Sequence, residues 1–175
     1  MALFSRKIGL RDLAPILLNT VRTTAMLYLI IIGASVFGPF LTLTHIPATL
    51  GESLGLLGLG MYGTLLVIVL GYIVLGMFFD GLAMLVITLP IVFPIITGVG
   101  FDPIWFGVIA VIVVEMGLIT PPVGINVFVV KGIATDVPMA TIFKGVLPFW
   151  FAMAACLLIL TVFPELALFL PNRMQ

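Results

Sequence analysis

The stretch EMGLITPPVGIN, residues 115–126, decides the fold, because two adjacent prolines interrupt an otherwise apolar run there. Neither Pro121 nor Pro122 has an N–H, so the carbonyls of Gly117 and Leu118 are predicted to lose their intrahelical donors. Each proline also disfavours the helical conformation of the residue before it. Unpaired carbonyls at membrane depth are costly unless they line a wet cavity or bind a cation.

Two interpretations of this interruption are open. Discontinuous helices with exposed carbonyls coordinate sodium in many secondary transporters, and Thr120 and Asn126 add side-chain oxygens beside the prolines. The alternative is a proline kink whose free carbonyls are satisfied by neighbouring helices. The tandem pair, lying between Thr120 and Gly124, favours an ion or substrate site.

The composition around this stretch is that of a membrane protein. Hydrophobic residues make up 63% of the 175 residues and charged residues 8%, against about 45–50% and about 25% in soluble domains. Seven basic and seven acidic residues balance, which leaves no electrostatic footprint for nucleic acid. A single cysteine excludes an internal disulfide, and a single histidine excludes paired-histidine zinc motifs. We expect an all-α protein in a lipid bilayer, without a cofactor.

Upstream of the interruption lie two apolar runs, 61–79 and 82–99, separated only by Asp80 and Gly81. At ~20 residues per crossing, two full spans and a re-entrant hairpin are both possible. The turn holds no Lys or Arg, which a cytoplasmic loop usually contains. This favours a hairpin made of the two runs.

The broken helix itself covers about 103–131, with Asp102 predicted as its cap and Pro103 in its first position. The other expected elements are a cytoplasmic lead with an interfacial amphipathic helix at 1–22, a span at about 23–39, and a last span at about 147–163.

The basic residues predict an orientation. Six of the seven gather before the first span and before the last span: Arg6, Lys7, Arg11 and Arg22, then Lys131 and Lys144. The seventh, Arg173, lies alone near the C-terminus and weighs little. Under the positive-inside rule both groups are cytoplasmic. The N-terminus is therefore expected in the cytoplasm and the C-terminus outside.

Two carboxylates lie in apolar surroundings and are candidates for function. Asp80 is either an intramembrane carboxylate or a loop residue in water. Glu115, ~18 Å along the broken helix at 1.5 Å per residue, supports an ion site or forms a structural ion pair. An intramembrane aspartyl protease that pairs Asp80 with Asp102 is the enzyme alternative. It is disfavoured because the Gly-x-Gly-Asp string is absent and Asp102 has the simpler role of a cap.

Four motifs together resemble the large membrane subunit of tripartite ATP-independent periplasmic (TRAP) transporters, and the resemblance covers nearly the whole chain. They are GMFFDGLAM at 76–84, LPIVFP at 89–94, FDPIWFG at 101–107 and EMGLITPPVGIN at 115–126.

The resemblance implies the second inverted repeat of an elevator-type transporter driven by a sodium gradient, in the bacterial inner membrane. It implies import of organic acids such as C4-dicarboxylates, with a periplasmic substrate-binding protein and a small membrane subunit as partners. It implies a re-entrant hairpin over about 59–98. Sodium would lie near Asp80, at the tip of this hairpin, and near Thr120 to Gly124. The site residues it implies are Gly76, Asp80, Gly81, Gly117, Leu118, Thr120, Pro121, Pro122, Val123, Gly124 and Asn126, with Glu115 in support.

A complete large subunit is more than twice as long as this chain and holds a first repeat that is not found here. We therefore expect a fragment, a truncated reading frame or a split gene product, with the missing first repeat as a partner. An assembly-only or inactive membrane fragment is the alternative.

Overall fold

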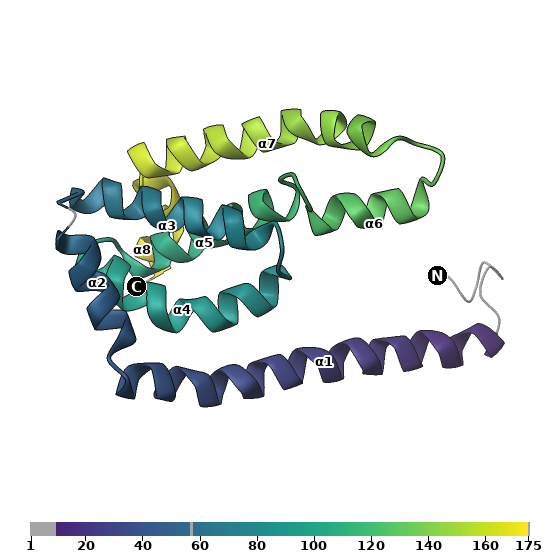
Figure 1. The fold of residues 1–175 in the computed structure, drawn as a ribbon, viewed down its shortest axis with the longest axis horizontal. Coiled ribbons are helices and arrows are strands. Elements are labelled where there is room, and N and C mark those ends of the chain that lie inside the picture. Colours follow the sequence, from purple (N-terminus) through teal and green to yellow (C-terminus); the bar gives the residue numbers. More distant parts are fainter. Residues whose placement is uncertain (1–9, 57, 175) are drawn as a thin grey trace.

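The computed structural model describes residues 10–56 and 58–174, and every regular element in those ranges is an α-helix. In chain order they are α1 (Leu10–Leu43), α2 (Ile46–Leu56), α3 (Gly60–Gly76), α4 (Gly81–Gly98), α5 (Pro103–Leu118), α6 (Ile125–Ile133), α7 (Met139–Val162) and α8 (Glu165–Met174). The two longest helices, α1 and α7, lie on opposite sides of the molecule, with α3, α4 and α5 between them (Figure 1).

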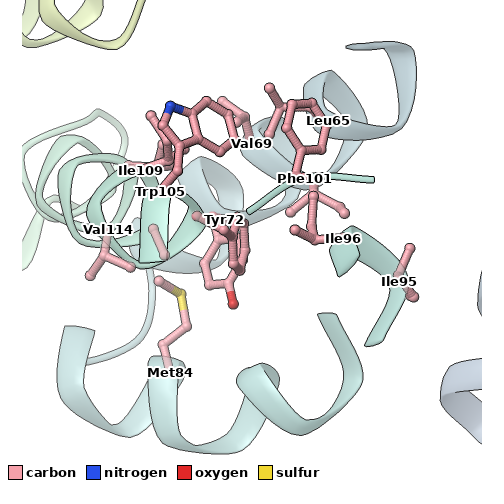
Figure 2. Packing of buried hydrophobic residues seen from close by; sticks show 14 of the residues in the cluster. Leu65, Val69, Tyr72, Met84, Ile95, Ile96, Phe101, Trp105, Ile109 and Val114 are labelled. Carbon is pink, nitrogen blue, oxygen red and sulfur yellow. The ribbon is translucent and has the colours of Figure 1, made fainter. Parts of the chain in front are cut away.

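The centre of the fold is α5. It packs against α3 on one side, and it also contacts α4, α7 and α8. Most of its residues are buried, among them Trp105, Phe106, Ile109 and Val113. A helix that is apolar on every side is typical of a buried position, and Figure 2 shows its side chains meeting Tyr72 of α3 and Met84 of α4.

Three described helices are long and apolar enough to cross a membrane: Leu13–Leu41, Gly81–Gly98 and Met139–Val162. Two shorter apolar helices, Gly60–Gly76 and Pro103–Leu118, lie among them. Large apolar side chains stay exposed along α1 and α7, as expected for surfaces that meet lipid rather than water. The chain is therefore a membrane protein with helical spans.

The outer helices are longer than the sequence predicts. The expected interfacial helix and first span form one helix, α1, which passes through Pro39 and ends at Leu43. Likewise α7 begins at Met139 and contains Pro148, whereas the last span was expected from about 147. A single proline removes one backbone hydrogen bond, but without competing water the remaining bonds hold the helix together. Arg6 and Lys7 of the predicted lead lie outside the described residues.

Aspartates cap α4 and α5 in the same way. The Asp102 carboxylate accepts hydrogen bonds from the backbone N–H groups of Ile104 at 2.8 Å and Trp105 at 3.1 Å. Pro103 occupies the first helical position, where its missing N–H costs nothing. The predicted cap at Asp102 is confirmed.

Glycine allows the C-terminal ends of α3 and α5 to touch through their backbones. A Cβ atom added at Gly76 would lie 2.9 Å from the Gly117 Cα, and one added at Gly117 would lie 2.8 Å from the Gly76 Cα. Gly81, just beyond the turn, sits over Val114 and Leu118 of α5, where an added Cβ would approach the Val114 Cγ1 to 2.8 Å. Small residues allow this close approach between membrane helices.

We therefore expect Gly76→Ala and Gly117→Ala each to destabilise the protein by about 1–3 kcal/mol, because the added methyl group meets backbone atoms that cannot turn away. Matched controls lie on the same two helices, since a Cβ atom at Gly71 or Gly107 would meet nothing within 4 Å. Gly71→Ala and Gly107→Ala should be neutral or slightly stabilising, because alanine favours helix. Thermal unfolding in detergent measures the difference, and equal midpoints for the two pairs would contradict the close packing.

Candidate functional site

The glycine contact brings two interruptions of the chain together. Residues 77–80 form the turn between α3 and α4, and residues 119–124 separate α5 from α6. Because Gly76 and Gly117 touch, the turn and the break both start from the same point. The sequence predicted function at each of them, and the structure places their starts side by side.

In the turn, Asp80 has a structural role that the sequence analysis did not foresee. Its Oδ1 atom accepts hydrogen bonds from the backbone N–H groups of Leu82 at 3.1 Å and Ala83 at 3.2 Å, so it is the N-cap of α4. The side chain is exposed. Within the described part of the chain, its other carboxylate oxygen accepts no hydrogen bond. A cap of this kind leaves that oxygen able to face a cation.

In the break, the chain leaves the helix at Leu118 and resumes it at Ile125, where the prolines predict an interruption. Pro121 and Pro122 are joined by a cis peptide bond. Gly124 adopts φ 62°, in the left-handed region that glycine tolerates best. A Cβ atom there would also come within 3.2 Å of the Thr120 carbonyl oxygen. Val123 is half-buried beside it.

The predicted loss of carbonyl partners is wrong for Gly117 and right for Leu118. The Thr120 N–H donates to the Gly117 carbonyl at 3.0 Å, the tighter bond with which helix ends often close. Among residues 10–56 and 58–174, no hydrogen bond reaches the carbonyls of Leu118, Ile119 and Thr120. Three consecutive carbonyl oxygens are thus available at the end of α5.

The Thr120 hydroxyl is held from two sides. It donates to the Met116 carbonyl one turn earlier and accepts a hydrogen bond from the Trp150 indole N–H of α7 at 3.0 Å. Trp150 was not among the site residues predicted from the sequence. The available signal was its chemistry, because a tryptophan N–H away from water usually finds an acceptor.

Two other predicted residues stand apart from these bonds. Asn126, in the first turn of α6, is exposed, and Glu115 lies on an exposed side of α5. Neither side chain makes a hydrogen bond or an ion pair within the described residues. The structural ion pair considered for Glu115 is therefore not found in that part of the chain.

A pocket of about 300 Å³ adjoins the break and faces α7. Thr120 and Pro121 line one side of it, and Lys144 and Trp150 line the other. A larger pocket of about 640 Å³ lies elsewhere, between α2 and the C-terminal half of α4, and includes His45 and Glu52. Size alone does not mark the site, because the smaller pocket is the one that adjoins the break.

The two aspartates cannot form a catalytic pair. Asp80 caps the start of α4 and Asp102 follows its end. The 18 residues of α4 separate them by ~27 Å along the helix axis at 1.5 Å per residue.

Comparison with known proteins agrees with the motifs. The family model described as "Tripartite ATP-independent periplasmic transporter, DctM component" matches residues 1–166. The chain is 37% identical over 167 residues to a C4-dicarboxylate TRAP transporter large permease protein of Pseudomonas aeruginosa, covering 95% of this chain and 39% of that protein. It is 35% identical to the sialic acid TRAP transporter large permease protein of Vibrio cholerae, covering 93% of this chain and 38% of that protein.

A third relative is the ectoine TRAP transporter large permease protein of Halomonas elongata, 28% identical over 94% of this chain and 38% of that protein. The chain thus spans about two fifths of the length of these curated relatives. The resemblance drawn from the four motifs is confirmed, and the protein is a transporter component rather than an enzyme: the chain belongs to the DctM family of large permease subunits of TRAP transporters.

Proposed function

We propose that this chain supplies the second repeat of a sodium-driven elevator-type transporter that imports organic acids across the bacterial inner membrane. The observation that carries the proposal is the junction of the turn at 77–80 with the break at 119–124. Three carbonyls there accept no hydrogen bond from any described residue. Sodium is a hard cation that such oxygens coordinate, and broken helices supply them in other transporters.

In this proposal α3, the turn and α4 form a re-entrant hairpin whose tip, from Gly76 to Gly81, meets the break. Asp80 supplies a negative charge there. The carbonyls of Leu118, Ile119 and Thr120 supply neutral oxygens. Because Gly76 and Gly117 pack backbone to backbone, the tip and the break move as one body, which alternating access by rigid motion requires.

The substrate class follows from the relatives' names and stays a proposal for this chain. Two of those relatives carry C4-dicarboxylate and sialic acid in their names, and a third carries ectoine. We propose a small organic acid, delivered by a periplasmic substrate-binding protein. The remaining partners are the small TRAP membrane subunit and a first repeat, because a midplane site needs both repeats. An assembly-only fragment is the alternative function.

For orientation we propose that the N-terminus is cytoplasmic and the C-terminus periplasmic. Lys131 and Lys144 flank the connection between α6 and α7. The Lys131 ammonium donates to the backbone carbonyls of Thr135 at 2.6 Å and Val137 at 2.8 Å. Lysines in such a connection support a cytoplasmic location under the positive-inside rule.

The charge of Asp80 can be tested apart from its cap. Asparagine caps helices about as well as aspartate, so Asp80→Asn should preserve the fold while it removes one charge from the ion site. In the assembled transporter we expect at least a roughly tenfold higher sodium concentration at half-maximal uptake, the equivalent of about 1.4 kcal/mol. Asp102→Asn is the matched control, because Asp102 caps α5 through the same two kinds of bond. An equal sodium dependence in both variants would leave Asp80 as a cap only.

The break can be tested through its backbone. Replacing both Pro121 and Pro122 by alanine restores two N–H donors and lets α5 continue, so that its free carbonyls find internal partners. The sodium concentration at half-maximal uptake should rise about tenfold or more if those carbonyls bind the ion. Pro148→Ala in the uninterrupted helix α7 is the control and should change little. Wild-type sodium affinity in the double variant would show that the prolines only bend the helix.

A further inference from the structure

One side chain outside both interruptions reaches into the break. Trp150 lies midway along α7, and its indole N–H donates to the Thr120 Oγ1 atom at 3.0 Å. The ring also lines the pocket beside Thr120 and Pro121. Phe151 packs edge to face against the ring, with centroids 5.4 Å apart. The indole is thus half-buried, in contact with Phe151 and hydrogen-bonded to Thr120.

The hydrogen bond from Trp150 restricts which further bonds the Thr120 hydroxyl oxygen can make. A threonine hydroxyl has one hydrogen to donate and two lone pairs that accept. Its hydrogen goes to the Met116 carbonyl, and Trp150 occupies one lone pair. The remaining lone pair has a direction set by the other two bonds. It belongs to the residue that ends the row of free carbonyls from Leu118 to Thr120.

The second tryptophan of the chain provides an internal comparison. The Trp105 indole N–H also joins α5 to α7, donating to the Leu160 carbonyl at 2.8 Å. Leu160 lies about 15 Å along α7 from Trp150 at 1.5 Å per residue. Both bonds hold α7 against α5 or its end, but only the bond from Trp150 ends on an atom of the break.

We propose that Trp150 is a positioning residue for the cation site: it holds the Thr120 hydroxyl so that its free lone pair faces the ion bound by the neighbouring carbonyls. This inference rests on the proposed function, in which the break binds sodium. Trp150 itself touches no ion. Its contribution is to remove the rotational freedom of the hydroxyl before sodium arrives, which lowers the cost of binding.

The test uses the assembled transporter with this chain as its second repeat, and it measures uptake against sodium concentration at constant ionic strength with choline. Trp150→Phe keeps an aromatic ring in the pocket and removes the N–H. We expect the half-maximal sodium concentration to rise about 5- to 10-fold, the effect of one hydrogen bond, with the maximal rate unchanged. Trp105→Phe, the matched control, should leave sodium dependence at the wild-type value.

Threonine variants test the same bond from its other end. Thr120→Ser keeps the hydroxyl and should keep the wild-type half-maximal sodium concentration. Thr120→Val should raise that concentration at least as much as Trp150→Phe does. A merely structural role for Trp150 would instead lower stability and maximal rate in Trp150→Phe and Trp105→Phe alike. That outcome, or an unchanged half-maximal sodium concentration in Trp150→Phe, would overturn the inference while leaving sodium coupling intact.

A second measurement is independent of transport and of the Trp150 variant's folding. The chain has two tryptophans, so Trp105→Phe leaves Trp150 as the sole indole of an assembled transporter whose other subunits carry no tryptophan. We expect sodium, and not choline, to change its fluorescence, with the change kept in Thr120→Ser and lost in Thr120→Val. No response in the parent protein would contradict the positioning role. Sodium-independent uptake by the wild type would instead overturn the proposed function, and the inference with it.

Discussion

Contact between the backbones of Gly76 and Gly117 is the constraint on which the rest of the structure depends. It joins the ends of α3 and α5 so closely that a single methyl group would fall within 3 Å of the opposing Cα atom. The turn that ends at Asp80 and the break that begins after Leu118 therefore lie side by side. Without that contact each would be an isolated irregular segment in a membrane, where unpaired backbone groups are costly.

The sequence predicts much of this arrangement because its signals are local. Tandem prolines next to Thr120 determine where the helix stops, and Asp102 followed by Pro103 determines where it starts. Two other features were missed, each for its own reason. The Trp150 bond to Thr120 spans 30 residues of sequence, and no periodicity reveals it. The rescue of the Gly117 carbonyl by the Thr120 N–H depends on how the last turn tightens, which composition does not encode. The first and last spans, expected at about 23–39 and 147–163, are parts of the longer helices α1 and α7, because a membrane helix tolerates one missing bond at a proline.

The site that emerges combines oxygens of three kinds. There is an aspartate with one oxygen committed to a helix cap, a row of backbone carbonyls without described partners, and a hydroxyl held by Met116 and Trp150. The carbonyls come from the end of α5, the most buried helix of the described chain. The surrounding helices α1 and α7 keep broad apolar surfaces exposed. These surfaces suit contact with lipid and with the further elements that relatives more than twice as long possess.

We propose that this chain contributes one half of a sodium-coupled site. The most direct measurement is organic-acid uptake into proteoliposomes under an inward sodium gradient, with a purified binding protein and the small membrane subunit. It is made once with this chain as the only large-subunit protein and once with the chain plus a protein that supplies the first repeat. The account predicts uptake only in the second case, and only while the sodium gradient lasts, because a midplane site and its moving bundle need both repeats. Uptake that is indifferent to sodium, or full activity from the chain without that partner, would contradict it.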